Sequence, residues 1–355
     1  MMKKILFAMD EIGISGIVSV ANNLCACLLE QDDMEISVLC LSISDRTKID
    51  MRIPVFDLDL NKYGKKQRYL KLIPSIKDFF SSHRFDTLVV CGMEFVPFYF
   101  IACKNIKGMK KIAWEHRNFN TYPKYRLEWF GRRIACKSFD HVVCLTKRDH
   151  GYYLDYLNDR EKIRQIYNIM KIQKNSAEYD VESKTILSIG SLHPIKGFDM
   201  LLEIAEIVLK KHDDWIWEIY GAGAELENLQ RMASEKKLTG KVLFKGFVSD
   251  VSQVYKKSSF FVLTSRAEGM PSVLIEAKRH YLPVVSFDID CGPSDVIEDG
   301  INGFLIKPYD VCKMAERISA LIEDSNLRLQ MSKNSENDLS DFETESIVNS
   351  WKEIL

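Results

Sequence analysis

Short apolar runs alternate along this chain with longer segments in which apolar residues recur every three or four positions. In the first half, the runs cover residues 4–9, 35–41, 86–92, 111–116 and 141–146. Helical patterns lie between the runs, notably over 16–31 and 66–82. Continuous apolar strands separated by helices are typical of a parallel sheet with both faces covered. This half therefore predicts a doubly wound α/β domain.

The same alternation restarts after a polar segment at 170–184. Its apolar runs cover 184–191, 215–221, 241–246, 258–265, 282–288 and 303–308. We therefore predict two Rossmann-like doubly wound parallel-sheet domains, residues 1–170 and 171–340, with 341–355 as a C-terminal helix that packs back on the first. Ligands of open α/β sheets bind outside the carboxyl ends of the strands, so the expected site is a cleft faced by both sheets.

Length and net charge change this picture little. With 355 residues and 46% apolar content, the chain is longer than one core usually serves. A net charge of -1 speaks against nucleic acid as a partner. Residues 1–180, however, carry 18 lysines and 11 arginines against 22 acidic residues. Two interpretations of this excess stay open: an anionic partner, such as a phosphate-bearing substrate or a membrane surface, or simply solvated basic faces.

The cysteines and the longest apolar stretch indicate a cytoplasmic protein. Most of the nine cysteines lie in apolar runs, without a CxxC pair or zinc-like spacing, which predicts reduced core thiols and no metal site. The stretch 87–103 contains Gly92, Glu94 and Pro97, so we expect a buried strand, a turn and a helix rather than a bilayer span. Any membrane contact is then peripheral.

The segment EGMPSVLIEAK, residues 268–278, places a carboxylate on each side of a turn. It follows a predicted strand, and Pro271 suits the first turn of a helix. The N–H groups and positive dipole of a helix start bind phosphate, and Gly269 lets a ligand approach the main chain. Carboxylates beside a phosphate suit neutral hydroxyls, so Glu268 and Glu276 predict a sugar on one side and a ribose on the other. The alternative is an acidic loop followed by a glutamate on a helix surface.

Other strand ends of the second domain also carry residues suited to a nucleotide. Gly190 ends the first strand, and Lys196 supplies a phosphate counter-charge at the following turn. Gly221 and Gly223 follow the second strand, and residues 245–250 offer backbone groups after the third.

With these segments in place, the sequence resembles glycosyltransferase family 4, retaining enzymes of the GT-B fold, along nearly its whole length. The resemblance rests on GSLHPIKGF, YGAGAELENL, FKGFVSD and the Glu-x7-Glu pair in EGMPSVLIEA. It implies that Glu268 contacts hydroxyls of the donor sugar, that Glu276 contacts the ribose, and that Lys196 binds the diphosphate. The backbone near Phe247 and Val248 would hold the base. The donor-binding set is then Gly16, Gly190, Ser191, Gly221, Gly223, Phe247, Val248, Arg266, Gly269, Met270, Pro271, Ser272 and Glu276.

Position 191 departs from the family pattern. Many members have an arginine there that shares phosphate binding with the lysine, whereas Ser191 offers one neutral hydrogen bond. Arg266, beside the acid pair, is the candidate to compensate, and its alternative is an ordinary residue of a surface loop.

The first domain contributes two candidates. Gly13 and Gly16 form a G-x-x-G turn after the first strand, so Gly16 is expected to touch the donor phosphate; an ordinary tight turn is the alternative. His116 follows the fourth strand, between Glu115 and Arg117. Similar segments lie at the junction of sugar and acceptor in the family. This implies that His116 makes a polar contact to the reacting sugar or the acceptor rather than acting as a base.

Basic and aromatic residues are interspersed over 62–80 and 122–137. Such a pattern suits an interfacial helix on anionic lipid, and the alternative is a helix packed on its own domain with a solvated basic face. The charged positions of the first segment are Lys62, Lys65, Lys66, Arg68 and Lys71.

Together these residues predict a cytoplasmic, retaining glycosyltransferase of polysaccharide or lipid-linked glycan synthesis. It would move a hexose or N-acetylhexosamine from a UDP-linked donor to a saccharide or lipid-linked saccharide acceptor, with Glu268, Lys196 and His116 as the catalytic set. No metal or other cofactor is expected, because the lysine and the helix start supply positive charge. A sugar-nucleotide epimerase of the same fold and a non-catalytic sugar-nucleotide-binding subunit stay open as alternatives.

Overall fold

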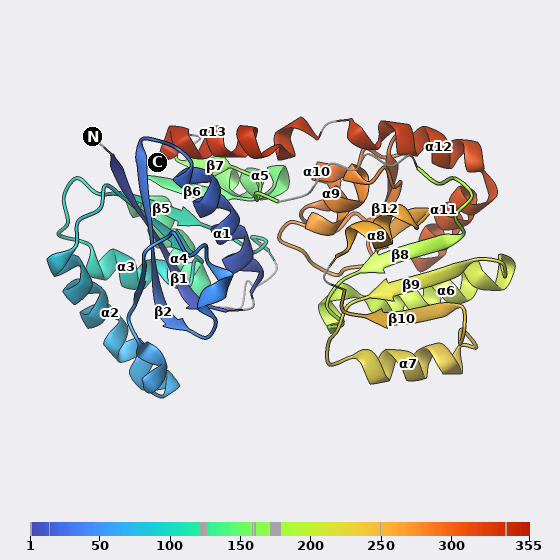
Figure 1. The fold of residues 1–355 in the computed structure, drawn as a ribbon, viewed down its shortest axis with the longest axis horizontal. Coiled ribbons are helices and arrows are strands. Elements are labelled where there is room, and N and C mark those ends of the chain that lie inside the picture. The colour runs from blue at the N-terminus through green and yellow to red at the C-terminus, as the bar shows by residue number, and fades with distance from the viewer. Residues whose placement is uncertain are drawn as a thin grey trace. The chain divides into compact units, whose positions relative to one another are not determined.

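The computed structural model describes residues 2–13, 15–120, 126–157, 159, 161–170, 179–248, 250–337 and 339–355. The chain divides into two compact units: unit 1 comprises residues 1–171 and 341–355, and unit 2 comprises residues 172–340 (Figure 1). Parts of three predictions lie outside the described residues: 171–178 of the polar segment, 122–125 of the second basic segment, and the Lys65 side chain.

A seven-stranded parallel sheet forms the centre of unit 1, in the spatial order β3-β2-β1-β4-β5-β6-β7. Its strands are β1 (Lys3–Ile12), β2 (Met34–Ile43), β3 (Val55–Asp57), β4 (Thr87–Cys91), β5 (Lys110–Trp114), β6 (His141–Cys144) and β7 (Ile163–Gln165). The helices of this unit include α1 (Gly16–Leu29), α2 (Lys65–Ser82), α3 (Val96–Ala102), α4 (Arg126–Ser138), α5 (Lys147–Leu157) and α13 (Thr344–Ile354).

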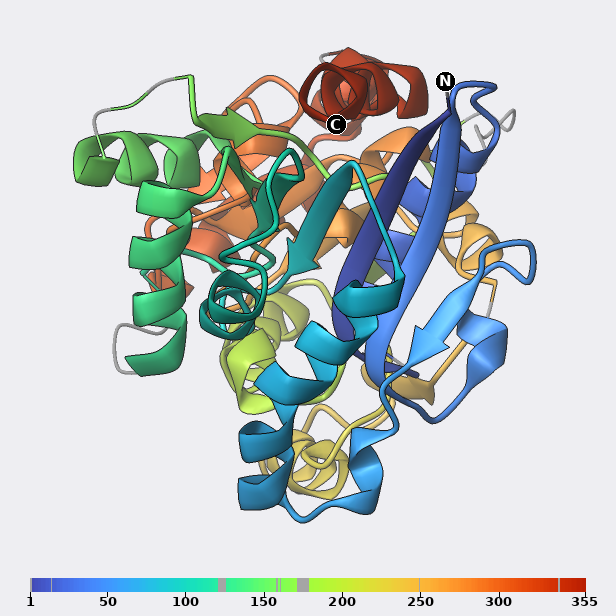
Figure 2. The ribbon, with the colours of Figure 1, turned by 90° about the vertical axis from the view of Figure 1, so that its left-hand side faces the viewer.

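Strand β1 shows why these runs are apolar at every position. Leu6 and Ala8 belong to the core that β1 shares with α2, α3, α4 and α5. Phe7 points to the opposite face, where its ring centroid lies 6.4 Å from those of Trp114 and Trp351. Figure 2 shows α2 and α3 on the viewer's side of this sheet. Successive side chains alternate between the faces, and both faces are covered along the middle of the strand, so residues 5–9 are all apolar and buried.

Helix α13 completes the second face of this sheet, although it is far from β1 in sequence (Figure 1). Trp351 is buried and packs edge to face on Trp114, with ring centroids 4.8 Å apart. The Thr87 hydroxyl donates to the carbonyl of Leu355 at 2.8 Å. Residues 341–355 are therefore part of the core of unit 1.

Unit 2 repeats the plan with a six-stranded parallel sheet in the order β10-β9-β8-β11-β12-β13. The strands are β8 (Thr185–Ile189), β9 (Ile216–Tyr220), β10 (Val242–Gly246), β11 (Phe260–Leu263), β12 (Val284–Phe287) and β13 (Gly303–Ile306). The helices include α6 (Phe198–Lys211), α7 (Leu226–Glu235), α8 (Ser252–Lys256), α9 (Ser272–Arg279), α10 (Pro293–Val296), α11 (Val311–Glu323) and α12 (Ser325–Lys333).

The prediction of two doubly wound parallel-sheet domains is confirmed. In each sheet the strand order reverses beside the first strand of the unit, between β1 and β4 in unit 1 and between β8 and β11 in unit 2. Such a reversal leaves a crevice outside the carboxyl ends of the two strands, which is where open α/β sheets bind ligands. The fold therefore marks one candidate position in each unit.

Candidate functional site

The reversal point of unit 2 gathers the predicted donor-binding residues of that unit. The loop after β8 carries Gly190, Ser191 and Lys196, and the loop after β11 carries Arg266 and Glu268. Because all strands are parallel, the loops after β9 and β10 lie at the same edge of the sheet. These two loops supply Gly221, Gly223, Phe247 and Val248.

Lys196 and Glu268, which the sequence assigned to different parts of a donor, bind each other. The Lys196 ammonium donates to both carboxylate oxygens of Glu268, at 2.7 and 2.8 Å. The Ser265 hydroxyl donates to Oε1 of the same carboxylate at 2.6 Å. The side chain of Glu268 is 9% exposed and that of Lys196 is 26% exposed. The pair is thus anchored on the acid side, while the lysine remains open to solvent.

Gly221 shows how tightly the loops after β8 and β9 are packed. Its φ is +147°, and a Cβ at this position would lie 1.8 Å from the carbonyl oxygen of Gly190. No residue other than glycine fits there without moving the backbone. The loop that bears Lys196 is therefore supported from behind by the end of β9.

Glu276 lies on α9, which begins at Ser272, directly after Pro271. The Tyr255 hydroxyl donates to its Oε2 at 3.0 Å, and burial is the main cause that raises the pKa of Glu276. A side-chain hydrogen bond with Ser272 also reaches this carboxylate, so two neighbours orient the group that is predicted to meet a ligand hydroxyl. The ring of Pro271 packs where a Cβ on Gly292 would lie, 2.2 Å from its Cδ, and this contact fixes the start of the helix.

The edge of the predicted base site is exposed. Phe247 follows β10, and 80% of its surface is open to solvent, which makes it one of the most exposed large apolar side chains described. Val248 is half-buried and Ser191 is exposed. An exposed aromatic ring beside a turn is suited to cover a planar base.

Arg266 has partners within unit 2. Its guanidinium forms two hydrogen bonds to the carboxylate of Asp199, at 2.8 and 2.5 Å, and donates to the carbonyl of Pro194 at 2.6 Å. These contacts engage both terminal nitrogens. The role of Arg266 as a phosphate ligand that compensates for Ser191 stays a prediction.

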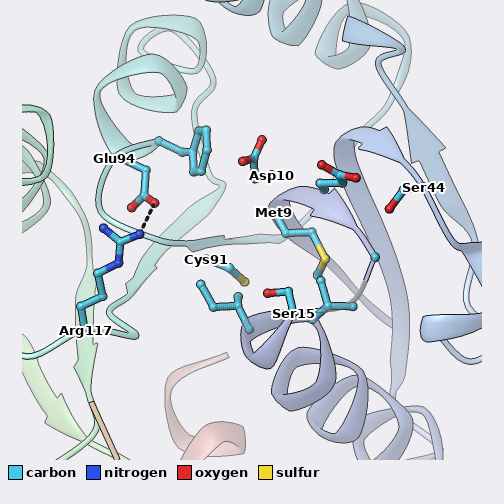
Figure 3. A pocket seen from close by; sticks show the side chains of 12 residues that line it. Met9, Asp10, Ser15, Ser44, Cys91, Glu94 and Arg117 are labelled. Atoms are coloured by element: carbon cyan, nitrogen blue, oxygen red, sulfur yellow. Dashed lines mark ion pairs between the residues drawn. The ribbon is translucent and has the colours of Figure 1, made fainter. Parts of the chain in front are cut away.

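A cavity of about 490 Å³ lies at the reversal point of unit 1 (Figure 3). Its residues come from the ends of β1, β2 and β4, from the start of α1, and from the segment after β5. Gly16 itself is the first residue of α1, between two lining residues. The lining residues are Met9, Asp10, Glu11, Gly13, Ser15, Ile17, Val18, Ser44, Cys91, Glu94, Phe95 and Arg117.

Two ion pairs set the charge of this cavity. Arg68 of α2 donates to the carboxylate of Asp10, and Arg117 lies 3.8 Å from Glu94. Burial is the main cause that raises the pKa of both Asp10 and Glu94. Arg68, which the sequence counted among the membrane-facing charges, instead points toward the end of β1.

His116 follows β5 and packs against Trp114, with ring centroids 4.4 Å apart. Its Nε2 is buried, and among the described residues it has no hydrogen-bond partner. Burial, together with the nearby charge of Arg117, lowers the pKa of His116 to about 3. The imidazole is therefore neutral at physiological pH and able to make one more hydrogen bond.

Glu115 points into unit 1, although the sequence placed it beside His116 at the edge of the expected site. Its Oε2 accepts hydrogen bonds from Arg132 Nε at 2.9 Å and from the Tyr153 hydroxyl at 3.2 Å. Its Oε1 accepts from the backbone N–H groups of His116 and Arg117, both at 3.1 Å. Glu115 thus holds the backbone that presents His116.

Several residues that support the site were not predicted from the sequence. The strand-end rule that selected Lys196 and Glu268 would also have selected Asp10 near the carboxyl end of β1 and Glu94 after β4. The supporting contacts of Asp199 and Tyr255 come from helices, and nothing in the local sequence marks them.

In the part of the chain that the structure describes, no helix is long and apolar enough to span a membrane. No three or more His, Cys, Asp or Glu side chains there are grouped so that they could hold a metal ion.

Comparisons with known proteins agree with this geometry. Residues 14–174 match the model of "Glycosyltransferase Family 4", and residues 170–338 match that of "Glycosyl transferases group 1". An uncharacterized glycosyltransferase of Haemophilus influenzae is 30% identical over 355 residues, and the match covers 100% of both chains. A poly(ribitol-phosphate) alpha-N-acetylglucosaminyltransferase of Staphylococcus aureus is 36% identical over 280 residues, which are 75% of this chain and 54% of that protein.

The fold has close counterparts among solved structures. A TarM variant of S. aureus, in complex with UDP and alpha-GlcNAc-glycerol among other ligands, superimposes with a TM-score of 0.83 at 20% identity over 99% of both chains. This likeness confirms the predicted fold, and the sequence matches confirm the predicted family and enzyme class. The chain belongs to the glycosyltransferases of the family 4 type, GT-B enzymes of polysaccharide biosynthesis.

Proposed function

We propose that this glycosyltransferase moves a hexose or N-acetylhexosamine from a UDP-linked donor to a saccharide acceptor, with retention at the anomeric carbon. The observation that carries the proposal is the Lys196–Glu268 pair at the reversal point of unit 2. The UDP bound by the structural relative and the N-acetylglucosaminyl group in the name of the sequence relative support the donor. The two alternatives from the sequence, an epimerase and a silent binding subunit, are not favoured.

The pair acts by exchanging partners. A donor diphosphate brings negative charge to Lys196 and competes with Glu268 for its N–H donors. As the lysine turns to the phosphate, the carboxylate of Glu268 gains free acceptor positions, which the hydroxyls of the donor sugar fill. Glu276, which Tyr255 and Ser272 orient, accepts a hydrogen bond from the ribose.

The reaction needs no protein nucleophile. The acceptor oxygen attacks the anomeric carbon on the face from which the diphosphate departs, and the departing phosphate oxygen takes the acceptor proton. Lys196 and the N–H groups at the start of α9 stabilise the charge that develops on the leaving group. The lysine ammonium and these N–H dipoles supply the charge stabilisation that a metal ion supplies in other phosphate chemistry, so we expect activity in the presence of a chelator.

The cavity of unit 1 is the proposed acceptor side of the enzyme. Its volume of about 490 Å³ lies in the range of small-molecule pockets. Asp10, Glu94 and Ser44 offer acceptors for hydroxyl groups, while Phe95 and Val18 offer apolar surface. His116, a neutral and half-buried imidazole, is proposed to make a polar contact to the reacting sugar or the acceptor.

Peripheral contact with the cytoplasmic membrane face is part of the proposal, because lipid-linked acceptors lie there. Helices α2, α3 and α4 pack in that order on one face of the unit 1 sheet. Leu70, Ile101 and Phe130 are exposed on them. Lys66, Lys71, Lys104, Arg133 and Lys137 are exposed on or next to the same helices. Exposed apolar and basic side chains together suit an anionic interface.

A ligand panel tests the donor. Melting temperatures are measured at one fixed concentration of UDP, GDP, ADP and a series of UDP-sugars, since the stabilisation of the folded state grows with the logarithm of ligand concentration over Kd. We expect UDP and one or two UDP-sugars to raise the melting temperature most. Equal shifts with all three diphosphates would refute a uridine donor, and NMR of the product would decide whether the anomeric configuration is retained.

A further inference from the structure

The segment 264–266, which follows β11, holds all three carbonyl groups of the turn that carries Lys196. The Thr264 hydroxyl donates to the carbonyl of Lys196 at 3.3 Å. The backbone N–H of Arg266 donates to the carbonyl of Ile195 at 2.7 Å. The guanidinium of Arg266 donates to the carbonyl of Pro194 at 2.6 Å. The turn is thus fixed to the strand end at every one of its residues.

Gly197 shows how closely the turn lies against that strand end. Its φ is +67°, in the left-handed region that favours glycine, and a Cβ there would lie 2.1 Å from the carbonyl oxygen of Thr264. No side chain fits between them. The backbone that follows Lys196 is therefore in direct contact with the segment that leads to Glu268.

Arg266 contacts residues on both sides of Lys196 in the sequence. Its guanidinium forks onto the carboxylate of Asp199 in the first turn of α6, and this hydrogen bonding is the main cause that lowers the pKa of Asp199. A bidentate arginine–carboxylate pair fixes geometry as well as charge. One guanidinium thus ties together Pro194, on one side of Lys196, and Asp199, on the other.

From this geometry we infer that Arg266 and Asp199 form a positioning pair, which holds the Lys196 turn where the ammonium meets both Glu268 and the donor diphosphate. Neither residue contacts the donor. The inference rests on the proposed function, in which Lys196 binds the diphosphate. The inference gives residues 265–269 two roles. This loop supplies Glu268, and it also sets the position of Lys196.

The difference between UDP and uridine isolates the contribution of the diphosphate. The full chain and its variants are titrated with UDP by calorimetry and with uridine by ligand-observed NMR. Lys196→Ala should weaken UDP and leave uridine unchanged. Arg266→Gln and Asp199→Asn should each weaken UDP on the order of tenfold, because a small displacement of a charged group is costly, again without an effect on uridine. Arg266→Lys cannot span the same partners and should recover only part of the loss.

Arg231→Gln is the matched control. Arg231 pairs with Glu235 on the exposed face of α7, outside the turn and its partners. This variant should bind UDP and uridine as the unmodified protein does. Melting temperatures of all variants show whether unit 2 remains folded.

The double variant Lys196→Ala/Arg266→Gln decides how Arg266 acts. A positioning residue works through the lysine, so the double variant should bind UDP no more weakly than Lys196→Ala alone. Additive losses would show that Arg266 contacts the diphosphate itself. Unchanged UDP binding in Arg266→Gln, or an equal loss of uridine, would show that the turn needs no such support. Each of these results overturns the inference and leaves the proposed function standing, whereas unchanged UDP binding in Lys196→Ala overturns both.

Discussion

The two units present charged side chains at the carboxyl ends of their strands, but they hold these charges in opposite ways. In unit 1, Glu115 and Arg132 are 2% and 6% exposed, and the carboxylate binds two side chains and two backbone N–H groups. In unit 2, Lys196 keeps 26% of its side-chain surface exposed and has Glu268 as its partner. The first arrangement fixes a backbone, whereas the second is able to exchange partners. Burial and the number of contacts thus distinguish Glu115, a charge that supports the fold, from Lys196, a charge that is proposed to bind the donor.

The largest effect on the transfer rate is expected from Glu268→Gln, which tests whether the unit 2 pair takes part in the reaction. The substitution keeps the shape of the side chain but removes the charge that binds Lys196 and the sugar hydroxyls. We expect the transfer rate to fall by about 10³-fold, comparable to the loss of one preorganised group in a transition state, with little change in melting temperature. Initial rates with the best donor from the panel measure this effect.

Glu235→Gln serves as the control for Glu268→Gln, because Glu235 is exposed on α7. It should retain the full transfer rate. A Glu268→Gln enzyme that works at the normal rate would remove Glu268 from the mechanism. A large loss of stability would instead make it a structural charge like Glu115.

The next largest effect is expected from Arg132→Met in unit 1. The change leaves Glu115 buried without its cation, and breaking a buried pair in this way costs about 3–5 kcal/mol of folding free energy. Urea denaturation measures the loss. Arg133→Met is the matched control on the same helix, because Arg133 is exposed and its guanidinium lies over the ring of Trp129, 4.7 Å from the centroid. It should cost less than about 1 kcal/mol, and equal losses from both variants would contradict the comparison.

The smallest expected effect concerns His116 and pH. Its folded pKa of about 3 lies below the value of an unfolded histidine, so the unfolded state binds the proton more readily. This contribution to stability is present above about pH 6.5 and is lost as the pH falls toward 3. We expect a slope of at most about 1.4 kcal/mol per pH unit, which is reduced in His116→Phe. Denaturation between pH 7 and 4 tests it, and parallel curves for both proteins would show that His116 is not buried neutral.

Much of the architecture was predictable, because a strand buried on both faces leaves a continuous apolar run. The runs at 35–41 and 303–308 found β2 and β13 in this way. Strands β3 and β7 were missed, since each has three residues, lies at an edge of the sheet and carries polar side chains. Short edge strands are defined by their neighbours rather than by their own pattern.

The candidate site was only partly predictable. Lys196 and Glu268 were found because loops after parallel strands share one edge, although their roles stay predictions. No local pattern indicates that the two side chains bind each other, or that Arg266 binds Asp199, since these contacts join residues about 70 positions apart. The inward direction of Glu115 depends on Arg132 and Tyr153, which come from two different helices.

The return of residues 341–355 to unit 1 has a consequence for synthesis on the ribosome. Trp351 packs against Phe7 and Trp114, so a nascent chain leaves the Phe7 ring without this partner until more than three hundred further residues have been translated, and the Trp114 ring until more than two hundred have been. Unit 2, made from one uninterrupted stretch, is able to reach its native state first. The half of the enzyme that emerges earliest is thus the last to be completed.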